Sequence, residues 1–381
     1  MNNKKTNNEL SIQLHKKLHG KISSSSKIKV RNERDLGLVY TPGVGAVSSL
    51  LASNPELASE YTIKSNTVAV ISDGSSVLGL GNTGPYGALP VMEGKSMLFS
   101  QLAGLRSFPI VLDTQDTEEI ISTIKHIAPA FAAINLEDIE APKCFEIERR
   151  LQEELTIPVV HDDQHATAIV VLAGLINALK VVGKSAEDCK VVLLGVGAAG
   201  IGTARLLVKY GFKDIILVDS KGIIVPDRAD LNSVKKELAL VTNNEKIKGG
   251  LAEALNNADI FIGLSTGGKL TARDIKLMNN QAIIFALANP DPEIIPEDAI
   301  GAGAGVVATG RSDFPNQINN VLVFPGLFKG LIMSRKKDVT DEIKLQAAKS
   351  LAGVIKKPSR NKIIPSVFDK KVVSAIAQSI L

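Results

Sequence analysis

The sequence predicts an α/β fold with two domains, the C-terminal one a Rossmann-type, doubly wound parallel sheet. The chain has 381 residues, which is more than one compact core usually contains. From Thr67 onward, apolar strand-like runs alternate with helix-like periodic segments, as in parallel sheets with crossover helices. A glycine-rich GxGxxG sequence, Gly195–Gly200, also follows directly after one of the strand-like runs.

The elements of the first half follow in order along the chain. Strands are expected at Thr67–Ser72, Pro109–Leu112, Ala132–Leu136 and Ile157–Val160, with helices near 90–105, 116–127 and 143–155. A long helix is expected over Gln164–Val182. The boundary between the domains is therefore expected near residue 160, which divides the chain into 1–160 and 161–381.

The second half contains five short β-rich runs. They cover Lys190–Leu194, Ile215–Val218, Asp259–Gly263, Ala282–Leu287 and Gly305–Ala308. A C-terminal helix is expected to begin after Thr340, whose hydroxyl can cap it. Asp341 and Glu342 then face the positive end of the helix dipole.

Composition excludes several classes of protein. With 45% hydrophobic and 22% charged residues, the chain is too apolar to be disordered and too mixed to be fibrous. The longest apolar stretch, Ala168–Ile176, is shorter than the roughly 20 residues of a membrane span. No signal-type apolar segment follows the polar start, and two cysteines make no disulfide framework. A cytoplasmic protein without a membrane partner is expected.

The positive charge is concentrated at the start of the chain. Residues 1–31 contain seven lysines and one arginine against Glu9, a local charge of +7, whereas the total is +4 and the remainder is −3. A nucleic-acid-binding arm is one interpretation. Leu10, Ile12, Leu14 and Leu18 without interleaved aromatic residues favour the other, a short helix with a solvated basic face. No nucleic-acid partner is expected.

GxGxxG occurs twice, as Gly79, Gly81 and Gly84 and as Gly195, Gly197 and Gly200. A dinucleotide loop needs a strand directly before it, a helix directly after it and an acidic residue about 20 positions further on. The second motif meets all three conditions, with Asp219 as the acid. The first is separated from its strand and is followed by Pro85, so a ligand-proximal turn is the better interpretation there.

Asp219 also bears on the choice of cofactor. A carboxylate accepts a hydrogen bond from a free ribose 2′-hydroxyl and repels a 2′-phosphate, which favours NAD over NADP. Lys221 and Arg228 are close enough in sequence to weaken this preference.

Two strands of the first half end in pairs of acids, Glu137–Asp138 and Asp162–Asp163. Ligands bind beyond the carboxyl ends of strands in open α/β sheets. Hard oxygen ligands without cysteine suit Mg²⁺ or Mn²⁺ rather than zinc. Solvated turn acids are the alternative for either pair alone, and the presence of two pairs favours a metal.

Lys95 lies on an otherwise apolar helical face with Val91, Leu98, Leu102 and Leu105. Burial there would lower the pKa of the amine toward the range of a general base. A lysine that reaches out from the edge of the apolar stripe is the alternative.

Tyr40 lies in a Pro/Gly-rich turn, "LVYTPGVG", where its hydroxyl could act as a general acid. A ring packed beneath a loop is the alternative interpretation.

With these residues in one chain, the sequence resembles the short prokaryotic malic enzymes over nearly its whole length. The matching strings include "YTPGVGAVS", "AVISDGSSVLGLGNTGP", "LPVMEGKSMLF", "INLEDIEAPKCFEIE", "IPVVHDDQHATA", "IIFALANPDPEI" and "ATGRSDFPNQINNVLVFPG". The resemblance implies oxidative decarboxylation of L-malate to pyruvate and CO₂ with NAD and Mn²⁺ or Mg²⁺. It also implies a homodimer or higher homo-oligomer.

The resemblance also implies a role for each candidate residue. Tyr40 and Lys95 match the catalytic acid and base, and Asp162 matches the acid beside the lysine. The implied metal ligands are Glu137, Asp138 and Asp163. The implied cofactor residues are Gly195, Gly197, Ala198, Ala199, Gly200, Asp219 and Asn289, and the implied substrate residues are Asn289, Asn319 and Asn320.

Two departures from the family pattern stand out. Ser75 and Ser76 occupy the loop in which larger members carry a substrate-binding arginine, and Ala166 replaces a usual glycine. Two alternative functions remain open from the sequence. One is an oxaloacetate decarboxylase with little net redox activity, and the other is a non-catalytic nucleotide-binding regulator.

Overall fold

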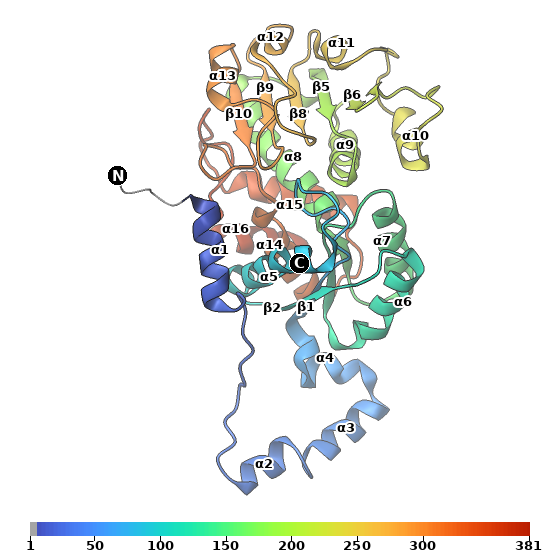
Figure 1. Ribbon diagram of the computed structural model, residues 1–381, viewed down its shortest axis with the longest axis vertical. Helices are drawn as coiled ribbons and strands as arrows, with labels where there is room; N and C mark the ends of the chain where they lie inside the picture. The colour runs from blue at the N-terminus through green and yellow to red at the C-terminus, as the bar shows by residue number, and fades with distance from the viewer. Residues whose placement is uncertain (1–5) are drawn as a thin grey trace.

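The computed structural model describes residues 6–381 and contains two sheets, one above the other in Figure 1. The first is a four-stranded parallel sheet in the order β2-β1-β3-β4. Its strands are β1 (Thr67–Ser72), β2 (Arg106–Val111), β3 (Ala133–Leu136) and β4 (Val159–His161). Every residue of β1 is buried, since its two faces are both covered by helices, as is usual in parallel sheets.

The helices of this half follow the expected order. They are α5 (Gly84–Leu98), α6 (Thr117–Ile127) and α7 (Lys143–Glu154). However, α5 differs from its prediction at both ends, since it ends at Leu98 and a π-helical segment, Phe99–Ala103, follows it. The sequence predicted the start of α5 near residue 90, but the helix begins six residues earlier. Pro85 does not break it, because proline in the first helical turn lacks only an N–H that would have no partner within the helix.

The second sheet has six strands in the order β10-β9-β8-β5-β6-β7. These are β5 (Lys190–Leu194), β6 (Asp214–Asp219), β7 (Gly222–Ile223), β8 (Ile260–Gly263), β9 (Ile283–Ala286) and β10 (Val306–Thr309). The chain proceeds from β5 first to one side and later to the other, which is the doubly wound arrangement that the sequence predicted. One feature differs: β7 pairs antiparallel with β6 and forms a short hairpin at the edge.

The long helix α8 (Asp162–Val182) connects the two sheets and is almost entirely buried. It packs against α9 (Ala198–Tyr210), and the largest hydrophobic cluster includes side chains of both sheets. Four short helices surround the second sheet: α10 (Ser233–Ala239), α11 (Leu251–Leu255), α12 (Ala272–Ile275) and α13 (Pro296–Gly301).

The last three helices are α14 (Phe324–Ser334), α15 (Asp341–Gly353) and α16 (Lys371–Ile380). Thr340 accepts a hydrogen bond from the backbone N–H of Ile343, which confirms the expected cap. Figure 1 shows these helices back at the level of the first sheet. There the ring of Phe324 contacts Phe99, with centroids 4.7 Å apart. A domain boundary at residue 160 remains a prediction, because the end of the chain packs against the first half.

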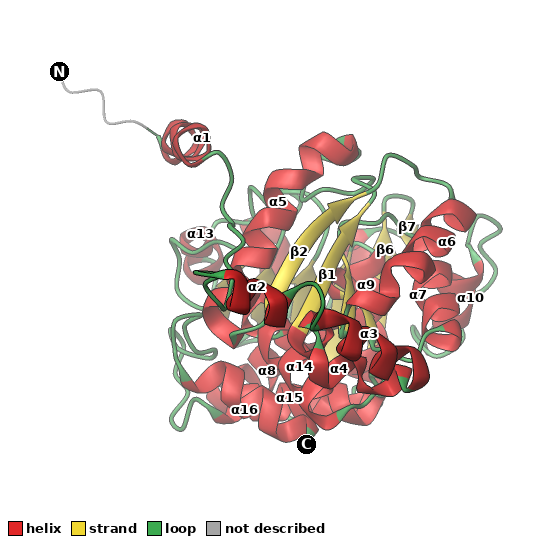
Figure 2. Ribbon diagram, turned by 90° about the horizontal axis from the view of Figure 1, so that it is seen from below, coloured by secondary structure: helices red, strands yellow, loops and turns green. Residues whose placement is uncertain are grey.

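The start of the chain is the part least covered by the rest of the protein. It contains α1 (Asn7–Leu18), α2 (Glu33–Val39), α3 (Val44–Ser53) and α4 (Ala58–Tyr61). Among the described residues before Thr67, none is buried. Figure 1 shows α2 and α3 in a long loop that projects from the body, and in Figure 2, seen from below, the two helices lie in front of it. The helix predicted from Leu10 to Leu18 is present, but its apolar side chains are exposed as well as its basic ones.

Two described segments are long and apolar enough to be tested as membrane spans, residues 33–53 and α8. α8 lies inside the protein core. Residues 33–53 are not one helix, because α2 ends at Val39 and α3 begins at Val44.

Candidate active site

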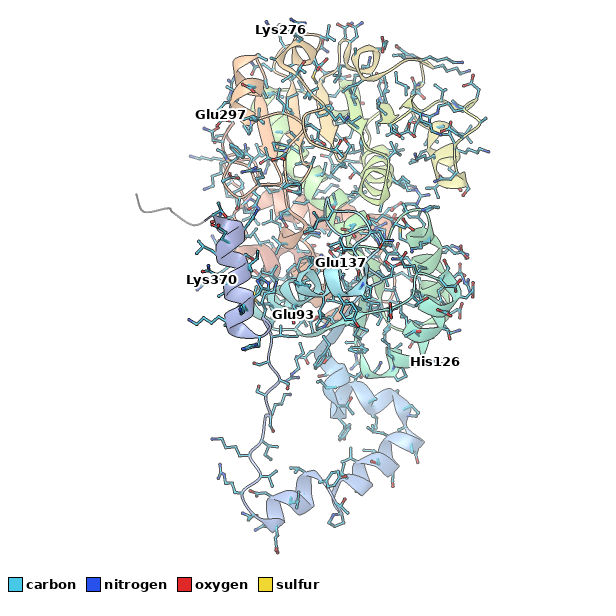
Figure 3. All side chains as sticks on the ribbon, in the orientation of Figure 1. Glu93, His126, Glu137, Lys276, Glu297 and Lys370 are labelled. Atoms are coloured by element: carbon cyan, nitrogen blue, oxygen red, sulfur yellow. The ribbon has the colours of Figure 1, made fainter. Side chains whose placement is uncertain are left out.

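A cavity of about 760 Å³ lies where the carboxyl ends of the strands of both sheets meet. Its walls include the segments that follow β3, β4, β5, β8 and β9, which is where ligands bind in open α/β sheets. Figure 3 places Glu137 in this central region of the molecule. Most of the candidate residues line the cavity: Lys95, Glu137, Asp138, Asp163, Gly197, Ala198, Ala199, Gly200, Asn289, Asn319 and Asn320.

Lys95 points inward from α5 and is only 7% exposed, as its apolar face predicted. Its Nζ lies 2.5 Å from Glu137 Oε1 and 2.5 Å from Asp162 Oδ2. Burial by itself lowers the pKa of the amine, but Asp162 and Glu137 outweigh it, and the net shift is upward. The predicted lowering of this pKa is therefore wrong for the protein without a cation, because two carboxylates stabilise the ammonium.

Asp162 connects the lysine to the second half of the chain. It is fully buried at the start of α8, and its Oδ2 also accepts a hydrogen bond from Asn320 Nδ2 at 2.5 Å. Burial raises the pKa of Asp162. Asn319 instead caps the short helix that follows it, by accepting from the N–H of Val321. The two neighbouring asparagines thus face different partners.

Glu137, Asp138 and Asp163 form a compact carboxylate cluster. One oxygen from each lies within 4.8 Å of the others. The amide of Asn135 holds Glu137 at 2.8 Å, and the N–H of Asp138 donates to Asp163 at 3.0 Å. Burial and the charge of Asp163 raise the pKa of Asp138 to about 7, and burial raises the pKa of Glu137 well above its usual range.

These carboxylates fit a divalent cation. Among the described residues, Asp138 Oδ2 is buried and has no hydrogen-bond partner. Like charges packed this closely in a buried place are unfavourable unless protons or a cation compensate them. Three carboxylates without nitrogen or sulfur ligands suit Mg²⁺ or Mn²⁺.

The loop that follows β1 supports this cluster. Ser75 Oγ donates to Asp73 Oδ1 at 2.6 Å and accepts from the N–H of Glu140 at 2.9 Å. Lys143 forms an ion pair with the buried Asp73 at 2.7 Å. Ser75 is one of the two serines in the loop where larger family members carry an arginine. Its hydrogen bonds connect the loop after β1 to the loop after β3.

Sequence reasoning missed Glu148, a buried carboxylate behind the α8 N-terminus. It accepts hydrogen bonds from the backbone N–H of His161 at 2.7 Å and from the ring of His165 at 2.9 Å. The signal was present, because Glu148 shares the apolar face of α7 with Ile147 and Leu151. An acid on such a face predicts a buried polar contact.

The second glycine motif has the backbone geometry of a tight strand-to-helix turn. Gly195 has φ +102°, and a Cβ there would lie 2.5 Å from the carbonyl oxygen of Leu264. A Cβ on Gly200 would lie 2.0 Å from the carbonyl oxygen of Gly195. α9 begins at Ala198, so the free N–H groups of its first turn border the cavity and can bind phosphate.

Asp219 ends β6, as predicted, but its carboxylate already has four donors. Arg228 binds it through both terminal nitrogens at 2.9 and 3.2 Å, Lys235 binds it at 2.8 Å, and the N–H of Lys221 donates at 3.0 Å. These hydrogen bonds lower the pKa of Asp219 although burial alone would raise it. Sequence reasoning identified Arg228 and missed Lys235, which α10 brings back to the strand end.

Two further residues differ in location from what the sequence suggested. Lys21, assigned to the solvated basic face, lines the cavity beside Gly94, and its Nζ donates to the carbonyl oxygen of Pro90 at 2.6 Å. Tyr40, the candidate general acid, is 66% exposed and does not line the cavity. The structure therefore brings the predicted metal ligands, Asp162 and the predicted asparagines together around Lys95, with residues 197–200 in the same cavity wall. Tyr40, Gly195 and Asp219 do not line this cavity.

Two sequence families cover the chain. "Malic enzyme, N-terminal domain" matches residues 19–120 and 114–152, and "Malic enzyme, NAD binding domain" matches residues 164–381. The chain belongs to the malic enzyme family.

Several malic enzymes are similar to the chain over most of its length. The NAD-dependent malic enzyme of Geobacillus stearothermophilus is 55% identical over 95% of this chain and 76% of that protein. The bifunctional malic/malolactic enzyme of Bacillus subtilis is 50% identical over 98% of this chain and 92% of that protein. The NADP-dependent malic enzyme of Halomonas elongata is 43% identical, with 96% and 91% covered.

The same family appears among solved structures. The crystal structure of the NAD-dependent malic enzyme of Thermotoga maritima superimposes with a TM-score of 0.94 and is 48% identical. The match covers 97% of this chain and 98% of that one. The α/β architecture with its two parallel sheets is thus the malic enzyme fold.

Proposed function

We propose that this malic enzyme converts L-malate to pyruvate and CO₂ with reduction of NAD, in a reaction that requires Mn²⁺ or Mg²⁺. One observation carries the proposal. A single cavity is lined by the paired Lys95, by the cluster of Glu137, Asp138 and Asp163, and by residues 197–200 of the glycine loop. Base, cation ligands and cofactor loop are thereby close enough to act on one small molecule.

In this proposal Glu137, Asp138 and Asp163 hold the cation. When bound, the cation and NAD supply the Lewis acid and the hydride acceptor, and the positive charge offsets the carboxylates that raise the pKa of Lys95.

Lys95 takes the proton of the substrate's C2 hydroxyl at Nζ. Asp162 holds the amine in place through Oδ2, and Asn320 donates a hydrogen bond to the same oxygen. Phe324 covers the amine at 4.5 Å and excludes water from that side. This arrangement positions the base before substrate arrives, so that little reorganisation is needed during the reaction.

A dicarboxylate substrate needs cationic or amide partners besides the metal site. We assign one carboxylate to Lys21, which is the other lysine in the cavity wall. Asn289 and Asn319 offer neutral amide donors from the second half of the chain. Tyr40 is proposed to protonate C3 of the enolate that decarboxylation leaves.

NAD is the proposed cofactor because Asp219 ends β6 in the position of a ribose-binding acid. Arg228 and Lys235 beside Asp219 are positively charged and can attract a 2′-phosphate, so we expect only moderate discrimination against NADP. We retain the prediction that the enzyme acts in the cytoplasm as a homo-oligomer.

The test is malate-dependent NADH formation by the purified protein with Mn²⁺, with and without a chelator. We expect reduction together with equimolar pyruvate, and loss of both after chelation. Rapid pyruvate release from oxaloacetate without any NADH from malate would instead identify an oxaloacetate decarboxylase. NAD binding with neither reaction would identify a regulator.

A further inference from the structure

Glu293 is a buried carboxylate to which the proposed reaction gives no role. It lies between β9 and α13 and is 0% exposed. In the described part of the chain, the other buried carboxylates outside the carboxylate cluster each have a lysine or histidine partner: Asp73 has Lys143, Glu148 has His165, Asp162 has Lys95 and Asp259 has Lys184. Glu293 has no such partner, although burying an unpaired charge is costly. Its hydrogen bonds must therefore explain what it does.

These hydrogen bonds join the segments that follow two neighbouring strands. Glu293 Oε1 accepts from the backbone N–H of Ser265, just after β8, at 3.1 Å. Glu293 Oε2 accepts from the backbone N–H of Ala288, just after β9, also at 3.1 Å. Both oxygens act as acceptors, as those of an ionised carboxylate do. The side chain therefore bridges the carboxyl ends of β8 and β9, which are paired in the sheet.

The carboxylate fits a space that a glycine leaves open. A Cβ on Gly263, the last residue of β8, would lie 2.3 Å from the carboxyl carbon of Glu293. The two backbone segments are also joined directly. The N–H of Leu270 donates to the carbonyl oxygen of Glu293 at 3.0 Å, and the N–H of Gly268 donates to that of Pro292 at 3.1 Å. Any larger residue at position 263 would displace the carboxylate from this space.

The bridged segments form one wall of the cavity. We call residues 264–265 and 287–289 the β8–β9 wall, and all five line the cavity. This wall also contacts both glycine motifs. The carbonyl oxygen of Leu264 lies 2.5 Å from the place of a Cβ on Gly195, and that of Asn289 lies 2.1 Å from the place of a Cβ on Gly79. The position of the wall therefore affects the cofactor loop and the contact with the first half of the chain.

The order of the strands indicates which half of NAD faces this wall. In the proposed cofactor site, Asp219 after β6 binds the ribose of the adenosine half, and the first turn of α9 after β5 binds the phosphates. β5 lies between β6 and β8 in the sheet, so the nicotinamide half is expected to extend toward β8 and β9. Asn289 of the wall also shares the cavity with Lys95, the proposed base.

We propose that Glu293 is a positioning residue for the nicotinamide half of the cofactor, and that its carboxylate holds the β8–β9 wall in the shape that binds the ring. Glu293 itself does not line the cavity, because it lies behind the backbone of Ser265 and Ala288. Without the carboxylate, two backbone N–H groups lose their acceptor and the two segments can separate. The inference rests on the proposed function for the identity of the cofactor, but it is tested by binding.

The first test measures the binding of NADH to the purified protein by the fluorescence of the reduced ring. Glu293→Ala is expected to raise the Kd for NADH about tenfold, because a wall that is correctly formed for about a tenth of the time lowers the apparent affinity by that factor. Glu293→Gln retains one acceptor oxygen and is expected to give an intermediate Kd. The affinity for Mn²⁺, measured by calorimetric titration, is expected to stay the same because its ligands follow β3 and β4.

Asp259→Ala is the matched control for a general loss of stability. Asp259 is also buried, but it precedes β8 and lies at the opposite end of that strand, where it binds Lys184 at 2.7 Å. Its replacement is expected to lower the melting temperature and to leave the Kd for NADH unchanged. An equal rise in this Kd in Asp259→Ala and Glu293→Ala would overturn the proposal, as would an unchanged Kd in Glu293→Ala.

The second test approaches the same contact from Gly263. The methyl group of Gly263→Ala is expected to displace the carboxylate and to weaken NADH binding about as much as Glu293→Ala does. In the variant with both substitutions the space is free, so the second substitution should add little to the first. Effects that multiply would show two independent sites and would contradict the proposal. If Glu293→Ala does not fold, an unchanged Kd in Gly263→Ala overturns it instead.

Binding and turnover separate this inference from the proposed function. A wild-type protein that binds NADH but forms none from malate would refute the proposed reaction alone, and the NADH titrations would still decide the role of Glu293. A wild-type protein that does not bind NADH would overturn both.

Discussion

Lys21 and Lys95 show how differently two lysines of one cavity are held. Lys95 is enclosed by carboxylates that fix its charge and position. Lys21 is only half-buried, burial lowers its pKa, and its amine has a backbone carbonyl as hydrogen-bond acceptor. An amine with a neutral acceptor retains donors for an incoming carboxylate.

Lys21→Ala is expected to raise the KM for malate and to change kcat little. Losing one charge-assisted hydrogen bond to the substrate costs about 1.5–3 kcal/mol, which corresponds to roughly a 10- to 150-fold rise in KM. Steady-state kinetics with varied malate measures it, and the KM for NAD should stay the same. Lys17→Ala on the exposed helix α1 is the matched control. A loss of kcat with unchanged KM would contradict this role.

Substitutions around Asp219 are expected to shift cofactor preference in opposite directions. Lys235→Ala removes a positive charge that offsets Asp219, so the ratio of kcat/KM for NAD to that for NADP should rise by about tenfold, or 1.4 kcal/mol. Asp219→Ala leaves Arg228 and Lys235 free to bind a 2′-phosphate, so the ratio should fall. Kinetics with both cofactors measures the ratio, and no change in either variant would mean that selection occurs elsewhere.

At the scale of elements, the site is made by strand ends. β3 and β4 are neighbours, so the acids that follow them are brought together although about 25 residues separate them in the chain. Glu148 on α7 then holds the first turn of α8, which carries Asp162 and Asp163. The carboxylate cluster therefore depends on the hydrogen bonds that Glu148 of α7 makes to the start of α8 as well as on its own three residues.

Binding of Mn²⁺ is expected to strengthen as the pH rises to about 7. The pKa of Asp138 is raised to about 7, so below that value a proton must leave before the carboxylate can bind the cation. The affinity should fall by up to about tenfold for each pH unit below 7. Calorimetric titration in buffers of different ionisation enthalpy measures both the affinity and the proton release.

In the protein without a cation, the raised pKa of Asp138 makes the folded state less stable as the pH rises, whereas the same rise in pH strengthens the binding of Mn²⁺. The folded state holds the proton of Asp138 more tightly than the unfolded state does. The contribution of this group to the free energy of unfolding is therefore present at low pH and is lost as the pH rises through about 7. For the binding prediction, an affinity for Mn²⁺ that stays the same between about pH 5.5 and 7 would be the contradicting result, because it would show that Asp138 is already ionised at the lower pH.

At the scale of the whole molecule, α8 and the C-terminal helices join the two sheets into one body, and only the start of the chain lies outside it. In the proposed homo-oligomer the folded protein is coupled to assembly, so its stability depends on protein concentration.

The melting temperature is accordingly expected to rise with protein concentration, and Leu38→Asp is expected to abolish this dependence. Leu38 is 68% exposed on α2, and a carboxylate there cannot be buried against another chain without a large cost. Sedimentation velocity should show dimers for the wild type and monomers for the variant. Leu240→Asp, at an exposed position in the second half, should remain dimeric.

The sequence by itself determined the local elements and the chemical types of the site. Alternation of apolar runs predicted the strands, the spacing of Gly195, Gly197 and Gly200 predicted the tight turn before α9, and the face of α5 predicted a buried Lys95. These features depend on residues that are close to one another in the sequence. The periodicity of apolar residues and the spacing of glycines therefore predict them.

Only the tertiary structure decided which groups share a cavity and what charge they carry. The pKa of Lys95 rises because Glu137 and Asp162 come from other elements, and Lys235 reaches Asp219 only because α10 returns to β6. It also placed Tyr40 directly after α2, exposed and away from the cavity. Coulomb energies and burial depend on distances between segments that are remote in sequence, and no local pattern encodes those distances.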